Sequence, residues 1–409
     1  MTDLADAPAA GSSPTPSDPD EARVAAALDK LLTDFPPKST EQRTFLGAQF
    51  DAGLAWVHFD EGHGGLGVAP RLQKLVQERT AAAGAPFAMF FNPIGYGMGA
   101  PTVYTHGSEA QRTRYLRPLF TGEEVWCQLF SEPGAGSDVA GLATRAVLDG
   151  DEWTVNGQKV WTTLAHVSRW GMLAARTDPN QPKHKGLTYF VVDMHAEGVE
   201  VRPLYQITGE AEFNEVYFTD TRIPDAERLG DVGDGWRVSL TTLMNERVSL
   251  GGGTAPRGSG AIAAAVKVWK DSDQSDPARR DELMKLWTRA EVLRLTNWRA
   301  SQKRSMGVPG PEGSIGKLAS AELNKAILEF AVDALGPEGM LLEGGYPMDR
   351  GSNLGMGGTP QRAFLRSRAN SIEGGTTEVM KNILGERVLG LPGDVRVDKD
   401  RPWIEVPRS

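Results

Sequence analysis

The sequence predicts an α+β fold in which a strand-rich segment separates two helical segments. Apolar residues recur at helical spacing after Glu21, in Val24, Leu28 and Leu31. Between residue 126 and about residue 224, several stretches alternate in polarity or are rich in β-branched and aromatic residues. The helical pattern returns from Gly235 onward. This order of elements favours a β-layer between helical layers.

Start and stop signals place the elements along the chain. The first 20 residues are rich in Pro, Ala and Ser and predict a disordered tail. Helices are predicted from 21 to the Pro36-Pro37 stop, and over about 39–52, 70–83, 86–105 and 108–120. Strands are predicted over 171–176, 187–193, 199–203 and 213–220. The resulting divisions are a tail (1–20), an N-terminal helical domain (21–124), a β-domain (125–230), a C-terminal helical domain (231–395) and a C-terminal tail (396–409).

Composition excludes several classes of protein. The chain has 409 residues, 40% hydrophobic and 24% charged, which is typical of a globular protein with two or three domains. Its net charge of −9 argues against a nucleic-acid surface or an anionic membrane as the main partner. The six histidines and the single Cys127 form no zinc-ligand spacing, so no metal site is expected. No apolar run reaches the roughly 20 residues of a membrane span, and no signal peptide is apparent. A single cysteine suits a reducing compartment, so a cytoplasmic protein is expected.

The stretch from Gln128 to Thr163 carries the strongest functional signal. Residues 131–138 read Ser-Glu-Pro-Gly-Ala-Gly-Ser-Asp, a small-residue loop whose glycines allow a flat ligand to approach and whose serines offer hydroxyl groups. Two alternating segments follow with Asp149-Gly150 and Asn156-Gly157 between them, and Asn-Gly predicts a hairpin turn. The second arm ends in Trp161, which is followed by two hydroxyl-bearing threonines. An aromatic residue held on a strand in this way is a candidate wall for a planar cofactor, although sandwich core is the commoner fate of a strand tryptophan.

The Ser-Glu-Pro-x-Ala-Gly-Ser-Asp run, followed by Lys-x-Trp-x-Thr at 159–163, resembles the flavin-binding β-domain of acyl-CoA dehydrogenases. Each motif alone is also compatible with an ordinary antiparallel sandwich. The resemblance covers about residues 22–395 and includes bacterial FadE-type members. It implies an N-terminal helical domain, a middle antiparallel β-domain and a C-terminal helical bundle.

The resemblance also implies a reaction. Members oxidise an acyl-CoA thioester to the trans-2-enoyl-CoA with FAD, and pass electrons to an electron-transfer flavoprotein. A carboxylate takes the α-proton while the β-hydrogen leaves as hydride to flavin N5. Many members carry this base at the position of Gly374, which here is glycine. Another subgroup carries it on the first helix of the last domain, at the position of Glu246.

Glu246 therefore becomes the expected catalytic base. Leu243 and Leu250 lie three residues before it and four after it, on one helical face, so Glu246 projects from an apolar stripe. A carboxylate there is costly unless it has a function, and apolar surroundings would raise its pKa toward the working range. The alternative is a structural glutamate that pairs with a core arginine or lies at the edge of the stripe.

Other site residues follow from the resemblance, position by position. The amide N–H of Gly374 matches the donor to the thioester carbonyl, a catalytic role that needs only backbone. Arg247 and Gly375 match substrate-binding positions, and Ser137 matches the boundary between flavin phosphate and substrate. Arg247 could equally be a structural ion-pair partner. The expected FAD-binding positions are Gln128, Phe130, Ser131, Ser137, Trp161, Thr163, Thr376 and Glu378.

Two departures from the family pattern concern the flavin site that a neighbouring subunit completes. The family's Arg-x-x-Phe-Gly motif is missing from residues 272–281, and Asp333 stands where a glutamine is usual. An aspartate facing a diphosphate would repel it. Two accounts fit these losses. Other residues hold the cofactor in a homodimer or homotetramer, or this chain forms a hetero-oligomer with a second acyl-CoA dehydrogenase subunit, as in bacterial members that act on bulky acyl-CoA, including steroid side chains.

Two alternative functions remain open. One is an acyl-CoA oxidase, which uses oxygen as electron acceptor. The other is a non-catalytic partner subunit that only completes a neighbour's site. The acyl chain is not predicted, although residues 86–100 and 236–254 are expected to set the depth of its pocket.

Overall fold

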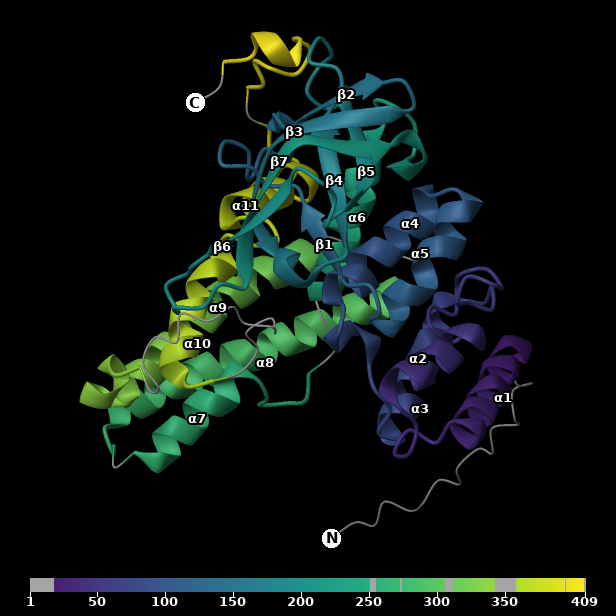
Figure 1. The fold of residues 1–409 in the computed structure, drawn as a ribbon. Helices are drawn as coiled ribbons and strands as arrows, with labels where there is room; N and C mark the ends of the chain where they lie inside the picture. The colour runs from purple at the N-terminus through teal and green to yellow at the C-terminus, as the bar shows by residue number, and fades with distance from the viewer. Residues whose placement is uncertain are drawn as a thin grey trace.

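The computed structural model describes residues 18–250, 255–272, 274–305, 312–342, 358–393 and 395–407. N-terminal helices lie on one side of a central sheet, and C-terminal helices extend from the sheet in another direction (Figure 1). The predicted fold class is confirmed. None of the described helices combines the length and the apolar character that a bilayer crossing requires.

The N-terminal domain contains helices with local capping signals. Ser108 and Gln111 form a reciprocal capping box at the start of one helix, and Gly122 ends that helix with a φ of 72°. Residues 1–17 of the predicted tail lie outside the described residues. The helices are α1 (Pro19–Asp34), α2 (Gln42–Asp51), α3 (Gln73–Ala82), α4 (Ala100–His106) and α5 (Glu109–Thr121).

The single helix predicted over 86–105 is wrong. Residues Ala88–Phe90 form a 3₁₀ turn, and Gly95–Gly99 form the π-helical turn η3 before α4. The buried side chain of Asn92 explains the interruption. Its amide donates to the Leu119 carbonyl at 2.9 Å, and its carbonyl accepts from the Gly95 amide at 3.1 Å. A long-range contact therefore overrides the local helical pattern.

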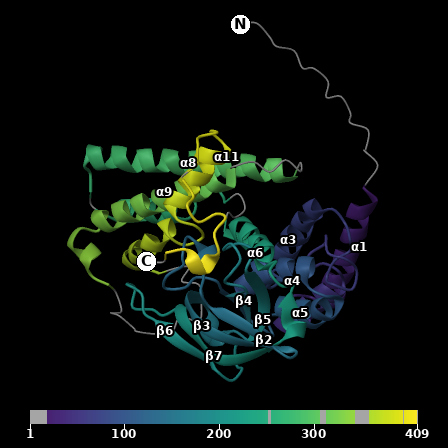
Figure 2. The same ribbon diagram turned by 90° about the horizontal axis from the view of Figure 1, so that it is seen from above.

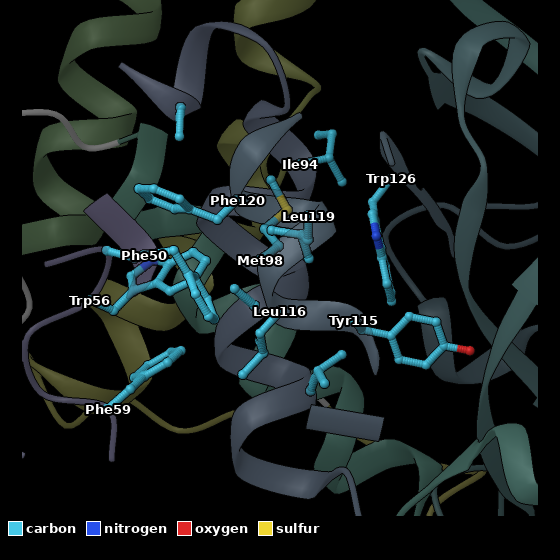
Figure 3. Close-up of a cluster of buried hydrophobic side chains, with 14 of the residues drawn as sticks. Phe50, Trp56, Phe59, Ile94, Met98, Tyr115, Leu116, Leu119, Phe120 and Trp126 are labelled. Atoms are coloured by element: carbon cyan, nitrogen blue, oxygen red, sulfur yellow. The ribbon is translucent and has the colours of Figure 1, made fainter. Parts of the chain in front are cut away.

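One apolar core joins this domain to the sheet. Phe50, Trp56 and Phe120 form a cluster of rings, with Trp56 and Phe120 centroids 5.1 Å apart. On the other side of α5, Tyr115 meets Trp126 edge-on at 5.3 Å (Figure 3). Trp126 is the first residue of β1, so this core fixes the strand that leads into the small-residue loop.

The described strands form one twisted, mostly antiparallel sheet. Their order is β6-β7-β3-β2-β4-β5-β8, and β1 pairs in parallel with β4. The strands predicted at 171–176, 187–193, 199–203 and 213–220 are confirmed within a few residues at their ends. The bounds are β1 (Trp126–Leu129), β2 (Arg145–Asp149), β3 (Glu152–Thr163), β4 (Trp170–Arg176), β5 (Leu187–Asp193), β6 (Val199–Leu204), β7 (Phe213–Pro224) and β8 (Arg228–Leu229).

The hairpin predicted at Asn156-Gly157 is wrong. β3 runs through both residues without turning, and the β2–β3 turn lies at Gly150 instead. Asn156 exchanges two hydrogen bonds with Asp220 of β7, at 2.9 and 3.0 Å, across an irregularity in the strand register. Asn-Gly here forms a bulge, because Gly157 lets the chain pass close to Thr144, where a Cβ would lie 2.4 Å from Oγ1.

The C-terminal domain is a helical bundle built around α9 (Figure 2). Ile327, Phe330 and Ala331 of α9 are buried against Ile262 of α7 and Leu286 of α8. The bounds are α6 (Gly235–Leu250), α7 (Ala261–Asp271), α8 (Pro277–Ser305), α9 (Glu312–Ala334), α10 (Pro360–Ser367), the 3₁₀ turn η8 (Arg368–Ser371) and α11 (Thr377–Arg387).

The segment 395–407, predicted as part of a C-terminal tail, packs on the β-domain. Trp403 is 8% exposed, its indole N–H donates to the Gly141 carbonyl at 3.1 Å, and the Arg176 guanidinium lies 4.6 Å from its ring. Lys183 pairs with both Asp138 and Asp398, so the segment also contacts the small-residue loop.

Candidate functional site

A buried ion pair anchors the small-residue loop. The Nζ of Lys159 lies 2.8 Å from Glu132 Oε1 and donates to the Phe130 carbonyl at 3.1 Å. The Glu132 carboxylate also accepts from the Ala143 and Thr144 amides, at 2.6 and 2.9 Å. Burial by itself would raise the pKa of Glu132, but the Lys159 ammonium and these hydrogen bonds hold it below its usual value. The buried side chains of Glu132 and Lys159 therefore fix the position of the loop.

The loop is otherwise exposed at 133, 134 and 136–138, while Ala135 is buried. A Cβ at Gly134 or Gly136 would meet no atom within 4 Å, so space rather than packing surrounds these glycines. Ser137 is exposed, Ser131 is half-buried, and the Ser131 carbonyl accepts from the Val160 amide at 2.9 Å. The exposed backbone and hydroxyl groups suit an elongated polar ligand lying along the loop.

Trp161 stands at the end of β3 in an unusual backbone conformation. Its φ is 60°, it lies within a register irregularity between Lys159 and Thr162, and its side chain is 57% exposed. Its ring meets that of Phe213 edge-on at 5.8 Å. An L-residue with a bulky side chain rarely adopts positive φ, and such strain clusters at functional sites. The core role considered for this tryptophan does not fit its exposure.

The other expected cofactor positions of the β-domain occupy different environments. Gln128 is half-buried on β1, and Thr163 is half-buried at the end of β3. Phe130 is 3% exposed and packs edge-on against Tyr189 at 5.8 Å. Phe130 thus lies in the core beneath the loop, while Trp161 lies at the surface.

The second part of the site is the turn that precedes α11. Gly374 and Gly375 have φ values of 63° and 98°, which glycine adopts without strain. Thr376 caps α11 by accepting from the Val379 amide at 3.2 Å, and Glu378 is exposed in the first turn. The N-terminus of a helix favours an anionic group, so this turn suits a phosphate, although Glu378 opposes it.

Glu246 is half-buried on α6, and Leu243 on its N-terminal side packs against the main core. The side chains of Arg247 and Leu250 lie outside the described residues. Lys317 of α9 is the informative neighbour, because the charge of Glu246 acts on it. Burial lowers the pKa of Lys317, and the carboxylates of Glu373 and Glu246 oppose this effect. The charge of Lys317 therefore acts on Glu246 as well, while Leu243 of the expected apolar stripe packs against the core.

Lys317 also links α9 to the turn before α11. Its Nζ donates to the Asn370 carbonyl at 2.8 Å. The Asn370 side chain donates to Glu373 at 2.9 Å and accepts from Asn324 at 2.6 Å. Glu373, next to Gly374, also receives two hydrogen bonds from Arg366, at 3.0 and 3.2 Å. Sequence reasoning missed Lys317, Asn370 and Arg366, because no local spacing connects residues from α9, η8 and α10.

Asp333, where repulsion of a diphosphate is expected, has a basic neighbour. Its carboxylate lies 3.7 Å from the guanidinium of Arg279, which also pairs with Glu282. Arg279 comes from the segment that lacks the expected Arg-x-x-Phe-Gly motif. The pair offsets the charge of Asp333 at this end of the bundle.

Together these elements provide three chemical functions. A carboxylate lies on α6, a glycine with positive φ lies in the turn before α11, and an exposed aromatic ring stands on β3. An ionised carboxylate is the form that accepts a proton. The arrangement suits proton abstraction beside a carbonyl group, against a planar redox cofactor.

Three family models match consecutive parts of the chain. They describe the N-terminal, middle and C-terminal domains of acyl-CoA dehydrogenases and match residues 23–123, 127–221 and 233–389. The acyl-CoA dehydrogenase IpdE1 of Mycobacterium tuberculosis is 38% identical over 84% of this chain and 86% of its own length. The acyl-CoA dehydrogenase FadE34 of the same organism is 39% identical over 84% of this chain, which spans only 45% of FadE34.

A solved structure shows the same fold. The ChsE4-ChsE5 complex from Mycobacterium tuberculosis matches with a TM-score of 0.67 and 26% identity. The match covers 93% of this chain and 99% of the compared chain. All three domains of the fold are thus shared.

Proposed function

Because this chain belongs to the acyl-CoA dehydrogenase family, whose members are FAD-binding oxidoreductases of lipid metabolism, we propose that it oxidises an acyl-CoA thioester to the trans-2-enoyl-CoA. Glu246 is the proposed base, and the Gly374 amide is the proposed donor to the thioester carbonyl. FAD is the proposed cofactor, with an electron-transfer flavoprotein as the electron acceptor.

The observation that carries this proposal is that two residues far apart in the sequence share the neighbour Lys317. Glu246 on α6 and Glu373, which precedes Gly374, both act electrostatically on Lys317. The base and the carbonyl donor are 128 positions apart in the sequence, yet α6, η8 and α11 all contact α9, the helix that carries Lys317. A substrate α-carbon between them would have a proton acceptor on one side and its carbonyl held on the other.

The chain's own residues then have defined roles. The Gly374 N–H donates to the thioester oxygen, which draws electron density from the α-carbon and acidifies it. Glu246 accepts the α-proton, and the electron pair of that C–H bond forms the new double bond as the β-hydrogen departs. FAD supplies the acceptor for that hydride when it is bound.

Several residues would hold FAD, and their environments fit a flat ligand with a diphosphate. Trp161 offers an exposed ring face, and the loop beside it has open space above its glycines. The capped N-terminus of α11 suits the diphosphate. The residues proposed to hold the cofactor are Gln128, Phe130, Ser131, Ser137, Trp161, Thr163, Thr376 and Glu378. Ser137, Arg247 and Gly375 are proposed to contact the substrate.

Glu246→Gln tests the base. The amide keeps the size of the side chain but cannot accept the proton, so flavin content should persist while flavin bleaching by acyl-CoA slows by roughly 10²–10⁴-fold. The matched control is Glu322→Gln, an exposed carboxylate on α9 that also acts on Lys317. Bleaching at the wild-type rate in Glu246→Gln would exclude Glu246 as the base. A panel of acyl-CoAs of graded length and bulk identifies the substrate.

A second candidate is a partner subunit in a hetero-oligomer. It is favoured by the missing Arg-x-x-Phe-Gly motif, by Asp333, and by the similarity to a chain from a complex of two different proteins. Flavin near one per chain in the protein expressed alone supports a homo-oligomer, whereas little flavin until a second subunit is co-expressed supports the hetero-oligomer. Peroxide production in air distinguishes an acyl-CoA oxidase from either.

A further inference from the structure

Two ion pairs join α10 to the segment that precedes β7. Arg362 donates to both carboxylate oxygens of Glu210, at 2.8 and 2.6 Å. One helical turn later, the Arg366 guanidinium lies 2.9 Å from the Glu212 carboxylate. We call these four residues the α10 clamp, which connects the C-terminal domain to the β-domain.

Arg366 also contacts residues outside the α10 clamp. Its guanidinium forms two hydrogen bonds with Glu373, which directly precedes Gly374. It also lies 5.5 Å from the ring centroid of Phe213, the ring that packs edge-on against Trp161. One side chain therefore connects the turn that carries the Gly374 amide with the aromatic wall on β3.

Glu212 is a costly partner for this arginine. It is 1% exposed, and within the described part of the chain neither of its carboxylate oxygens has a partner in hydrogen-bond geometry. Its carboxylate lies 2.9 Å from the Arg366 guanidinium, which is its ion-pair partner. Burial raises the pKa of Glu212, and Arg366 opposes this effect. Removing two charges from water costs free energy that their attraction only partly offsets, so such a pair is weak evidence for stability and suits a role in fixing geometry.

The geometry points to Arg366 as a positioning residue that fixes the Gly374 amide relative to the Trp161 wall, with Glu212 holding Arg366 in place. This inference rests on the proposed function, because it assigns Arg366 to the thioester-carbonyl donor. Arg366 acts through Glu373 and Phe213 and does not touch the reacting atoms.

The test compares Arg366→Met with Arg362→Met in the full-length protein. Both variants remove one arm of the α10 clamp, but the Arg362 guanidinium pairs with Glu210, whereas the Arg366 guanidinium pairs with Glu212 and Glu373. Arg366→Met should lower kcat by roughly 10- to 100-fold with KM little changed, since small displacements of a catalytic donor carry costs of this size. Arg362→Met should change kcat far less. Arg366→Lys, which keeps the charge but not the two-pronged geometry, should recover only part of the loss.

A second readout does not depend on activity. Amide hydrogen exchange over residues 370–376 should speed up in Arg366→Met and Glu212→Gln, and should stay at the wild-type rate in Arg362→Met. Equal effects of Arg366→Met and Arg362→Met in both measurements, or wild-type behaviour of Arg366→Met, would overturn the positioning role.

The experiments distinguish failure of the proposed function from failure of the positioning role of Arg366. If Glu246→Gln abolishes bleaching while Arg366→Met has wild-type kcat and exchange, the proposed function stands and the positioning role is lost. If the wild-type chain and its partner complex oxidise none of the acyl-CoAs, the proposed function fails, and the inference about the carbonyl donor fails with it. Faster exchange in Arg366→Met would then report only on the clamp.

Discussion

Lys159 and Glu132 form an ion pair, 2.8 Å between Nζ and Oε1, in which the lysine side chain is wholly buried and the glutamate side chain almost so. Breaking such a pair leaves one charge without compensation. Lys159→Met should therefore lower the free energy of unfolding by about 3–5 kcal/mol. The double variant Glu132→Gln/Lys159→Met should lose less than the single variant. Urea unfolding measures the free energy of unfolding of each variant. The pairing would be contradicted if the double variant lost as much unfolding free energy as the two single variants lose together.

The same pair predicts a dependence of stability on pH. The Lys159 ammonium and the hydrogen bonds hold the pKa of Glu132 in the folded protein below its ordinary value of 4.5, so the carboxylate contributes stability above that value and loses it as pH falls through the folded pKa. The double variant should thus show a flatter decline in unfolding free energy below about pH 4.5 than the wild type. If the unfolding free energies of the wild type and the double variant decline in parallel as pH falls, the pKa of Glu132 is not lowered in the folded protein.

Trp161→Gly should separate cofactor binding from stability. Relief of the positive φ gains about 1–2 kcal/mol, and loss of the edge-on contact with Phe213 costs about 0.5–1.5 kcal/mol. The apo protein should therefore keep its stability within about 1 kcal/mol, while flavin per chain falls. Trp153→Phe is the opposite control, because the buried Trp153 donates to Asp225 at 2.7 Å, and its replacement should cost stability but not flavin. Full flavin content in Trp161→Gly would exclude Trp161 as the wall.

Trp403→Ala should release the C-terminal segment. Truncation of a buried tryptophan costs about 3–5 kcal/mol, enough to detach a short surface segment without unfolding the protein. Amide exchange over 395–407 should increase strongly, while exchange in the sheet stays protected. Ile404→Ala changes an exposed neighbour and should leave exchange unaffected. If sheet amides lose protection together with the segment, the segment is an integral part of the β-domain.

Lys317→Met should change the pH profile of the reaction. The ammonium favours the ionised forms of nearby carboxylates, so its removal should move the acidic limb of kcat/KM to higher pH if Glu246 is the base. Lys325→Met, on the same helix and paired with Glu322, is the control. An unchanged acidic limb in Lys317→Met would separate Lys317 from the proton acceptor.

Some errors of the sequence reasoning share one cause. Asn156-Gly157 has the composition of a turn, but Asn156 forms two hydrogen bonds with Asp220, and the strand continues. Residues 86–105 have helical composition, but Asn92 bonds to the Leu119 carbonyl and interrupts the helix. In both cases a contact distant in sequence overrides a local preference that is worth only about 1 kcal/mol.

The sequence alone determined the order of helices and strands and the small-residue loop, because periodicity and turn residues are local properties, and its resemblance to a family made Glu246 and Trp161 candidates. Only the tertiary structure decided that the charges of Glu246 and Glu373 both act on Lys317, that Arg366 contacts Glu373 and Phe213, and that Glu132 is held by Lys159. These pairings join charges from separate elements. Their strength depends on burial and distance, which no single stretch of sequence records.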